Sequence, residues 1–387
     1  MLIVVSAILS WRVFFSQPSY PTKAFLWRQT NVYGLDNFGT ATYKDGVAYA
    51  PSKGNNKLYA VNATDGSPIW FCQVRQCDAS PYIDAYAVYV GECSGPNGEA
   101  TPAPKAMAVN RSSGEVVWSF VEPTDAPWVG SPVVYDEFVY YTTLGTGIYA
   151  LNKTDGEPAW HQNIGKVVCS VAYNNGLVFV SADDPSGQYA FNATTGEMVW
   201  RKNYGSSWDS SPVVYKGMVI QVAGDTTRDN VSTYVLNETT GELLTRFNQR
   251  GGQSTPLVHD DRIFIPSKNC QICAYNLLTG TELWHTNELA IGKPNLRRPD
   301  LSYSSPALAE GTIYYQSLSG AFYAIDEKTG SVQWTCQLGG YGFGSPSVGS
   351  GRVFITNDSA LYAFETRSFN TEWPMFCRNS FHQSYAN

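Results

Sequence analysis

The residues best suited to acid–base or metal chemistry are few in this chain of 387 residues, and they are scattered. Two acidic pairs, Asp183-Asp184 and Asp260-Asp261, fall at expected strand ends or hairpin tips, where solvated carboxylates are common. There is no Gly-x-Ser-x-Gly nucleophile elbow and no phosphate-binding loop. The histidines lack the spacing of a metal site; they are His161, His259, His285 and His382. We therefore assign no catalytic residue and no metal site.

The eight cysteines are the other reactive group, and their even number is typical of a protein with disulfides. Cys77 precedes one expected strand and Cys93 follows the next, so a bridge between them is feasible. Cys336 could similarly hold the carboxyl-terminal tail through Cys377. The connectivity stays open, because it needs geometry. The disulfide candidates are Cys77, Cys93, Cys270, Cys273, Cys336 and Cys377, whereas Cys72 and Cys169 have no evident partner.

A tandem repeat must position any functional side chain in this sequence. A typical copy has a Tyr-Ala-x-Asn segment, a turn with Gly, and Trp four residues after the Gly, as in IYALNKTDGEPAW. The fifth copy has Thr245 in the Trp place, and the last copy has lost its Gly. The eight copies end at Trp70, Trp118, Trp160, Trp200, Thr245, Trp284, Trp334 and Trp373, at spacings of 39 to 50 residues. This is the length of one four-stranded blade. We predict an all-β, eight-bladed β-propeller with antiparallel blades, forming one domain over residues 21–387.

The recurring residues have structural explanations. Asn can hydrogen-bond its own backbone and Gly accepts a positive φ, which together favour a tight turn between the last two strands of each blade. Because Trp recurs at seven of the eight final positions, we interpret it as packing between adjacent blades rather than as a cofactor-binding box. A Ser-Pro or Thr-Pro pair opens the first strand in six copies, at Ser80, Ser131, Ser211, Thr255, Ser305 and Ser345. Since Pro cannot donate to a ladder, this strand should be the inner edge.

The amino-terminal segment predicts how the ring closes. Phe25-Leu-Trp27-Arg-Gln resembles a final strand that has no preceding strands of its own, and Trp27 lies one period before Trp70. We expect this strand to complete the last blade, whose other strands come from residues 345–365. Such an exchange would remove the exposed sheet edge.

Before this strand, residues 1–20 contain a short apolar run, Leu2 to Leu9, with no Lys or Arg ahead of it and Arg12 behind it. We interpret residues 1–20 as a signal peptide or a truncated leader, with a short membrane anchor as the alternative. The expected location is therefore secreted or luminal. The seven glycosylation candidates are Asn62, Asn110, Asn152, Asn192, Asn230, Asn237 and Asn357. Five of them share the turn position of the repeat, which leaves duplication of a turn former as an equal explanation.

Composition limits the partners. The net charge is −7, which argues against nucleic acid or an anionic membrane, since both need a concentrated basic face. The one local basic cluster, Lys293, Arg297 and Arg298, is too small to reverse this. We expect a monomer that is not an integral membrane protein.

The repeats resemble those of the pyrroloquinoline-quinone (PQQ)-like β-propeller superfamily, whose pattern is Tyr-Ala-x-Asp-x-x-Thr-Gly-x-x-x-Trp. The segment Trp373-Pro-Met-Phe376 is also similar to one common in that group. The resemblance covers about residues 25–377. The superfamily includes BamB-like assembly lipoproteins and quinoprotein alcohol dehydrogenases, so it implies the fold more specifically than an activity.

The dehydrogenase branch would imply PQQ with calcium, together with a disulfide between two adjacent cysteines beside the quinone. No two cysteines are adjacent here, and Cys270-Gln-Ile-Cys273 is the nearest arrangement. The calcium ligands and the catalytic Asp of that branch cannot be placed on this sequence. We therefore expect no cofactor, with PQQ and calcium as the alternative.

The loops that break the repeat predict a binding site. The three long insertions, Glu92–Lys105, Gly224–Ser232 and Thr286–Ser302, should emerge on one face of the ring, at one mouth of its channel. Aromatic and charged residues precede the first strands on that face. The ligand-binding candidates are Trp128, Trp208, Asp209, Arg297, Arg298, Tyr303 and Phe343. The alternative is that the aromatic residues cap the core beneath the loops.

Taken together, these features favour a non-catalytic binding or interaction propeller that holds a small molecule or a protein partner at the channel mouth. Two alternatives stay open: a PQQ-dependent oxidoreductase or its degenerate relative, and a BamB-like assembly scaffold.

Overall fold

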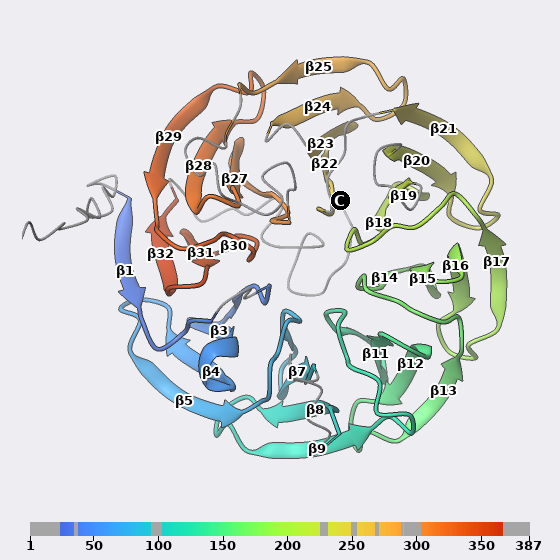
Figure 1. The fold of residues 1–387 in the computed structure, drawn as a ribbon, viewed down its shortest axis with the longest axis horizontal. Coiled ribbons are helices and arrows are strands. Elements are labelled where there is room, and N and C mark those ends of the chain that lie inside the picture. The colour runs from blue at the N-terminus through green and yellow to red at the C-terminus, as the bar shows by residue number, and fades with distance from the viewer. Residues whose placement is uncertain are drawn as a thin grey trace, which may run out of the picture.

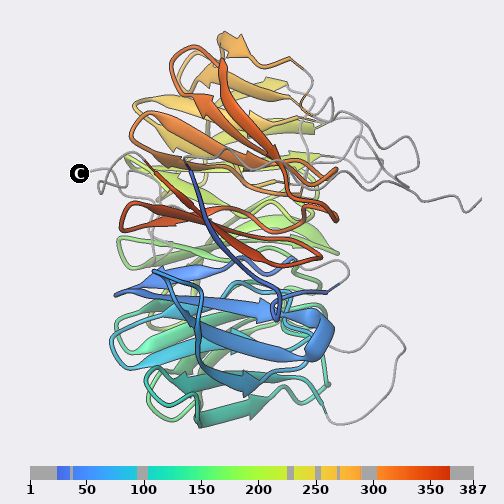
Figure 2. The same cartoon turned by 90° about the vertical axis from the view of Figure 1, so that its left-hand side faces the viewer.

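The fold is a ring of eight four-stranded antiparallel sheets around a central channel (Figure 1). The computed structural model describes residues 24–34, 38–93, 103–224, 231–248, 254–267, 271–287, 289 and 303–366. In each sheet, or blade, the strands run outward from the channel as strands A, B, C and D. Seen from the side, they cross the thickness of the ring (Figure 2). The predicted eight-bladed propeller is therefore confirmed.

The blades follow one another along the chain. Blade 1 comprises β2 (Thr42–Lys44), β3 (Val47–Ser52), β4 (Lys57–Asn62) and β5 (Pro68–Gln73), with a short 3-10 helix, η1 (Lys53–Asn55), between β3 and β4. Blade 2 comprises β6 (Tyr82–Ile83), β7 (Ala87–Gly91), β8 (Lys105–Asn110) and β9 (Val116–Val121). Blade 3 comprises β10 (Val133–Tyr135), β11 (Phe138–Thr143), β12 (Gly147–Asn152) and β13 (Pro158–Gln162). Blade 4 comprises β14 (Ala172–Asn174), β15 (Leu177–Asp183), β16 (Ser186–Asn192) and β17 (Met198–Lys202).

Blade 5 comprises β18 (Val213–Tyr215), β19 (Met218–Gly224), β20 (Val231–Asn237) and β21 (Leu243–Asn248). Blade 6 comprises β22 (Leu257–His259), β23 (Arg262–Pro266), β24 (Ile272–Asn276) and β25 (Glu282–His285). Blade 7 comprises β26 (Ala307–Ala309), β27 (Thr312–Gln316), β28 (Ala321–Asp326) and β29 (Val332–Gln337). Blade 8 comprises β30 (Ser347–Gly349), β31 (Arg352–Thr356), β32 (Leu361–Glu365) and, from the start of the chain, β1 (Phe25–Gln29).

The predicted closure of the ring is confirmed by β1. It pairs antiparallel with β32, where Trp27 lies opposite Ala363, so β1 becomes strand D of blade 8. The indole N–H of Trp27 donates to the carbonyl of Ala63 in blade 1 at 3.1 Å. The two ends of the repeat array are thus joined both within a sheet and between two blades.

The repeated Trp and Ala belong to one packing unit. In blade 1, Ala60 of strand C lies opposite Trp70 of strand D, and the same pair recurs as Ala150 and Trp160 in blade 3. A small residue leaves room for the large indole beside it. In blade 5, the pair changes on both sides, to Val235 opposite Thr245. Strand C therefore loses its small residue where strand D loses its Trp.

The indole also explains the glycine of the turn. The N–H of Trp70 donates at 3.0 Å to the carbonyl of Arg111, in the turn of the next blade. Gly114 of that turn has φ +77°, and a β-carbon on it would lie 2.8 Å from the Trp70 ring. In blade 5, which lacks Trp, Phe247 takes this place and a β-carbon on Gly280 would lie 2.9 Å from it. The turn glycine is therefore needed for both its conformation and its size.

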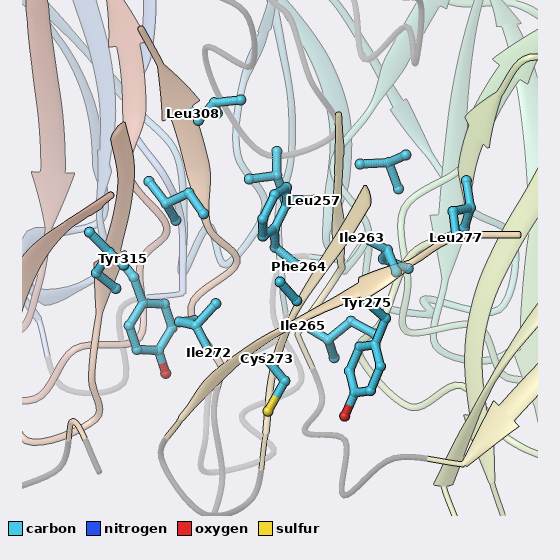
Figure 3. Packing of buried hydrophobic residues seen from close by; sticks show 14 of the residues in the cluster. Leu257, Ile263, Phe264, Ile265, Ile272, Cys273, Tyr275, Leu277, Leu308 and Tyr315 are labelled. Carbon is cyan, nitrogen blue, oxygen red and sulfur yellow. The ribbon is translucent and has the colours of Figure 1, made fainter. Parts of the chain in front are cut away.

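The hydrophobic core lies between neighbouring blades rather than inside one sheet layer. One cluster joins Val213 of blade 5, Leu257 and Phe264 of blade 6, and Tyr315 of blade 7. Figure 3 shows Leu257, Phe264 and Tyr315, from β22, β23 and β27, in the space between the sheets, with Ile272 and Cys273 of β24 beside them. Because each blade packs on both neighbours, the array gives the channel mouth a rigid frame.

Candidate functional site

A closed ring of hydrogen bonds surrounds the channel at the start of every strand A. In each blade, a Ser or Thr donates its backbone N–H to the side-chain hydroxyl of the equivalent residue in the next blade. The eight residues of this hydroxyl ring are, in order, Thr40, Ser80, Ser131, Ser170, Ser211, Thr255, Ser305 and Ser345, with N–O distances of 2.9–3.0 Å. The last bond, from Ser345 to Thr40, closes the circle.

A cavity of about 250 Å³ opens at the channel mouth beside the hydroxyl ring. Its lining includes hydroxyl-ring members such as Ser80, Ser131 and Ser211. The rest of the lining comes from the loops that join strand D of one blade to strand A of the next. All of these loop residues stand two positions before the ring residue of their blade; they are Phe38, Asp78, Val129, Val168, Asp209, Tyr303 and Phe343.

Three aromatic rings form the apolar side of this cavity. The ring centroids of Phe38 and Phe343 are 4.8 Å apart, and that of Tyr303 lies 5.5 Å from each of them. None of the three pairs is a parallel stack. Each side chain is partly exposed. The three rings, which we call the aromatic triad, thus present apolar surface at the mouth.

Two carboxylates, Asp78 and Asp209, supply the charge of the lining. Asp78 forms an ion pair with Lys53 at 2.9 Å, and the Lys53 ammonium lies 5.9 Å from the centre of the Phe38 ring. Lys53 comes from η1, in the connection between strands B and C of blade 1. The connections of this type and the loops before strand A therefore meet on the same face, as expected for antiparallel blades.

The structure separates the residues that the sequence grouped as ligand-binding candidates. Asp209, Tyr303 and Phe343 line the cavity together. Arg297 and Arg298 lie outside the described residues, as does most of each predicted insertion. Phe38 and Asp78 also line the cavity but were not among the candidates. Their position, two residues before a Ser or Thr that opens strand A, is the sequence signal that identifies them.

Trp128 belongs to the hydrophobic core. This agrees with the alternative interpretation from the sequence, in which the aromatic residues of these loops cap the core instead of binding a ligand. Its side chain is fully buried, with 0% exposure. The ring packs against Tyr141 and Tyr149 of blade 3, with centroids 5.6 and 5.4 Å away, and its N–H donates to the Pro104 carbonyl at 3.2 Å. Trp128 stands three residues before Ser131, so backbone alternation directs it away from the side that Val129 lines.

Trp208 also stands three positions before its ring residue, and it does not line the cavity. Its backbone has φ +54°, and its N–H donates to Asp183 Oδ1 at 2.9 Å. The same carboxylate oxygen accepts from the Ser206 hydroxyl. Burial raises the pKa of Asp183 above its usual value, although these hydrogen bonds act in the opposite direction. This acidic residue orders the loop that carries Asp209.

The structure does not contain the predicted bridge between Cys77 and Cys93. Both are free, buried thiols that donate to different backbone carbonyls, Cys77 to Ala79 at 3.2 Å and Cys93 to Trp128 at 3.3 Å. Cys273 and Cys336 are also buried. Their predicted partners, Cys270 and Cys377, lie outside the described residues, so these bridges stay predictions.

Alkylation of the native protein with iodoacetamide at pH 8 should leave Cys77, Cys93 and Cys169 unlabelled. Burial raises the pKa of Cys93 and Cys169 to about 12 and also raises that of Cys77, so the reactive thiolate is scarce. After unfolding without reductant, peptide mass mapping should find all three labelled. If Cys77 and Cys93 react only after reduction, the bridge predicted from the sequence exists and the thiol assignment fails.

The asparagines of the repeat turns act as turn formers. In the turn after β4, for example, Asn62 Oδ1 accepts the N–H of Thr64 at 2.8 Å. The same contact is made by Asn110, Asn152, Asn192 and Asn237. Asn357 is fully buried and its side-chain amide donates to the Gly339 carbonyl. Asn230 lies outside the described residues.

The described histidines have structural contacts. His259 bonds to the buried Glu327 at 2.6 Å, and Arg262 bonds to the same carboxylate oxygen at 2.7 Å. His161 stacks on Tyr149, with ring centroids 4.0 Å apart. Within the described part of the chain, no group of three or more His, Cys, Asp or Glu side chains could hold a metal ion. No helix in that part is both long and apolar enough to cross a membrane.

The described lining has no cationic side chain to hold the carboxylates of PQQ, because its charged groups are the carboxylates of Asp78 and Asp209. The sequence also lacks the adjacent pair of cysteines that the dehydrogenase branch would imply. We therefore derive no step through a quinone.

Comparison with known proteins gives one family and several relatives. A family model described as outer membrane protein assembly factor BamB matches residues 19–166, 165–290 and 293–382. A tetrathionate hydrolase from Acidithiobacillus ferrooxidans is 25% identical, over 88% of this chain and 76% of its own. The quinohemoprotein alcohol dehydrogenase ADH IIB from Pseudomonas putida is 33% identical, but over only 30% of this chain and 18% of its own. This chain thus spans less than a fifth of that dehydrogenase.

Two solved structures share the fold. BamB from Moraxella catarrhalis superposes with a TM-score of 0.68 and 16% sequence identity, covering 88% of this chain and 98% of its own. The quinohemoprotein alcohol dehydrogenase from Comamonas testosteroni gives a TM-score of 0.69 and 11% identity, covering 89% and 77%. At these identities the likeness concerns the propeller alone.

Proposed function

This chain belongs to the family described as outer membrane protein assembly factor BamB, and from that premise we propose that it is a non-catalytic binding propeller. It holds a small molecule or a segment of a partner protein at the channel mouth. The observation that carries this proposal is the cavity of about 250 Å³, where the aromatic triad meets two carboxylates and the hydroxyl ring.

The cavity has the composition of a binding site. Apolar rings give a ligand contact area, and a few polar groups fix its orientation. The frame is also preformed. Each loop residue of the lining stands two positions before a member of the hydroxyl ring, and this ring is hydrogen-bonded around the full circle. A preformed site loses little conformational entropy when a ligand binds.

We expect Phe343→Ala to weaken binding at the mouth by about ten-fold or more, because it removes the ring that contacts both other members of the triad. The measurement is ligand-observed NMR on the full chain with a panel of small aromatic and polar compounds. The panel includes PQQ with calcium. Phe71→Ala is the matched control, since Phe71 is 56% exposed on the outer strand β5.

Two results would contradict this proposal. Equal binding by wild type and Phe343→Ala, with the variant folded by circular dichroism, would place the site elsewhere. Tight retention of PQQ, with dye reduction on adding an alcohol, would replace the binding function with that of a quinone-dependent oxidoreductase.

A second candidate, the assembly scaffold, is favoured by the outer surface. The D strands are the outer edges of the blades, and they carry exposed apolar residues such as Ile69 on β5, Val117 on β9 and Met198 on β17. An outer edge of this kind can accept a strand from a partner chain. Substitution of Val117 by Lys would weaken such docking without affecting the mouth, so the two candidates can be distinguished.

A further inference from the structure

We infer that strand β9, the outer edge of blade 2, accepts an extended segment of a partner protein as an added strand (Figure 1). The segment has apolar side chains at alternate positions and a Lys or Arg at its end. This inference rests on the second candidate function, the scaffold, and specifies both the place of docking and the chemistry of the partner. It follows from a comparison of the eight outer strands.

All eight outer strands share one irregularity. Among the described residues, each pairs with its strand C alone, and each has a β-bulge one residue before the Trp position or its equivalent. The bulged residue of β9 is Val117. A bulge twists an edge and hinders its pairing with another chain. Because every blade has this bulge, the other residues of the strand must distinguish the edges.

Pro and charged side chains also protect exposed edges. Six of the other seven outer strands contain such residues, which are Arg28 in β1, Pro68 in β5, Pro158 in β13, Arg201 and Lys202 in β17, Arg246 in β21 and Glu282 in β25. In β5, the Lys57 ammonium also lies over Phe71, 3.9 Å from the ring centre. The seventh strand, β29, has the exposed polar side chains of Gln333, Thr335 and Gln337.

Strand β9 lacks this protection. Its sequence, Val-Val-Trp-Ser-Phe-Val, contains neither Pro nor a charged or amide side chain. Val116, Val117 and Val121 are 50%, 54% and 41% exposed. β-Branched and aromatic residues favour the extended conformation, and a short apolar stretch without Pro or charge is prone to pair with another strand. Of the eight outer edges, β9 is therefore the one best suited to receive a strand.

The backbone of β9 favours a strand over a helix as the partner. In an antiparallel pair, one neighbour bonds only part of the N–H and C=O groups of a strand, so the outer side of β9 keeps donors and acceptors for a second neighbour. An added strand bonds these groups and covers the exposed valines at the same time. A helix can cover the valines but cannot pair with the backbone edge.

Charges beside β9 specify the end of the partner segment. Three exposed carboxylates lie at the start of β9, in its own turn and in the turn of blade 3; they are Glu115, Asp155 and Glu157. The second turn adjoins β9, since the Trp118 N–H donates to the Lys153 carbonyl at 2.9 Å. Arg111 and Lys153, the cations of these turns, are paired with carboxylates of other turns. A basic residue at this end of the segment thus meets opposite charge.

The test uses three synthetic peptides on the full chain. The first is acetyl-Lys-Val-Thr-Val-Thr-Val-Lys-amide, the second has Glu in place of both Lys, and the third is the first with every Val and Thr N-methylated. Binding is measured by fluorescence anisotropy of labelled peptide. We expect the Lys peptide to bind at least about ten-fold more tightly than the N-methylated one, which lacks these backbone donors. The Glu peptide should bind about five-fold more weakly than the Lys peptide, with a smaller difference at high salt.

Two variants locate the binding edge. Val117→Lys should weaken binding of the Lys peptide by about ten-fold or more, because it gives β9 the charge that protects other edges. Val199→Lys is the matched control, since Val199 is the bulged residue of β17 and is 46% exposed. It should leave binding unchanged. Circular dichroism and thermal unfolding verify that both variants fold. In the wild type, the Lys peptide should also slow hydrogen exchange of the β9 amides.

The outcomes separate this inference from the proposed functions. Equal binding of the Lys and N-methylated peptides would overturn strand addition. If Val199→Lys abolishes binding and Val117→Lys does not, the scaffold function remains and the assignment to β9 fails. Self-association of the protein that Val117→Lys abolishes, measured by light scattering, would assign the edge to a second copy instead. If no peptide binds, the inference and the scaffold both fail, whereas binding at the mouth is tested separately by Phe343→Ala.

Discussion

Deletion of residues 1–30 should prevent the protein from forming a stable monomer. The deletion removes β1, and with it the hydrogen-bonded pairing with β32 and the buried side chain of Trp27, which is 8% exposed. Strand β32 would then present an unpaired edge from Leu361 to Phe364, which is the stretch that β1 covers in the intact protein. Exposed edges pair with other chains, so we expect dimers, larger assemblies or aggregation instead of a closed ring.

The measurement is size-exclusion chromatography with light scattering, followed by thermal unfolding. Deletion of residues 1–20 is the matched control, since it keeps β1, and it should leave the protein monomeric with an unchanged unfolding midpoint. Adding a synthetic peptide of residues 22–33 to the larger deletion should restore part of the stability. A monomer with the wild-type midpoint after deletion of residues 1–30 would show that the closure by β1 is not required.

The second large effect is expected for Trp128→Ala. We expect the free energy of unfolding to fall by about 3–5 kcal/mol, because the substitution leaves a large cavity among the aromatic rings of blades 2 and 3. It also removes the hydrogen bond to the Pro104 carbonyl and the contacts with Tyr141 and Tyr149. The measurement is unfolding in guanidinium chloride, followed by fluorescence and circular dichroism.

Phe343→Ala is the comparison for this experiment. Phe343 is also an aromatic residue of a loop before strand A, but it is partly exposed, so its loss should cost about 1–2 kcal/mol. Trp128→Ala should therefore mainly lower the stability, whereas Phe343→Ala should mainly weaken binding. If Trp128→Ala keeps the stability of the wild type within about 1 kcal/mol, the packing role assigned to Trp128 is wrong.

The contrast between these two residues shows how far the sequence could lead. The repeat predicts the blades, the turns and the closure by Trp27, because each depends on residue types that recur at fixed spacing. The same spacing could not show that Phe247 takes the place of Trp in blade 5, since this depends on which atoms meet Gly280 in the neighbouring blade.

The candidate site was harder to predict, because one residue along the chain changes the direction of a side chain. Aromatic residues three positions before the ring residue, Trp128 and Trp208, do not line the cavity, whereas Tyr303 and Phe343, at two positions before it, do. Composition alone treats all four as equivalent. The hydroxyl ring supplies the missing reference point, and its role as an acceptor in every blade is visible only from the hydrogen bonds.

The hydroxyl ring also bears on how such an array can grow. Every copy of the repeat carries both the donor and the acceptor of the hydrogen bond between blades. One residue donates its backbone N–H to the following copy and accepts from the preceding copy with its hydroxyl oxygen. A newly duplicated copy would therefore match its neighbours at once, with no second mutation to create a complementary surface. These hydrogen bonds can form with any number of copies, as in any head-to-tail assembly that closes by rotation. In this chain the circle closes with eight copies.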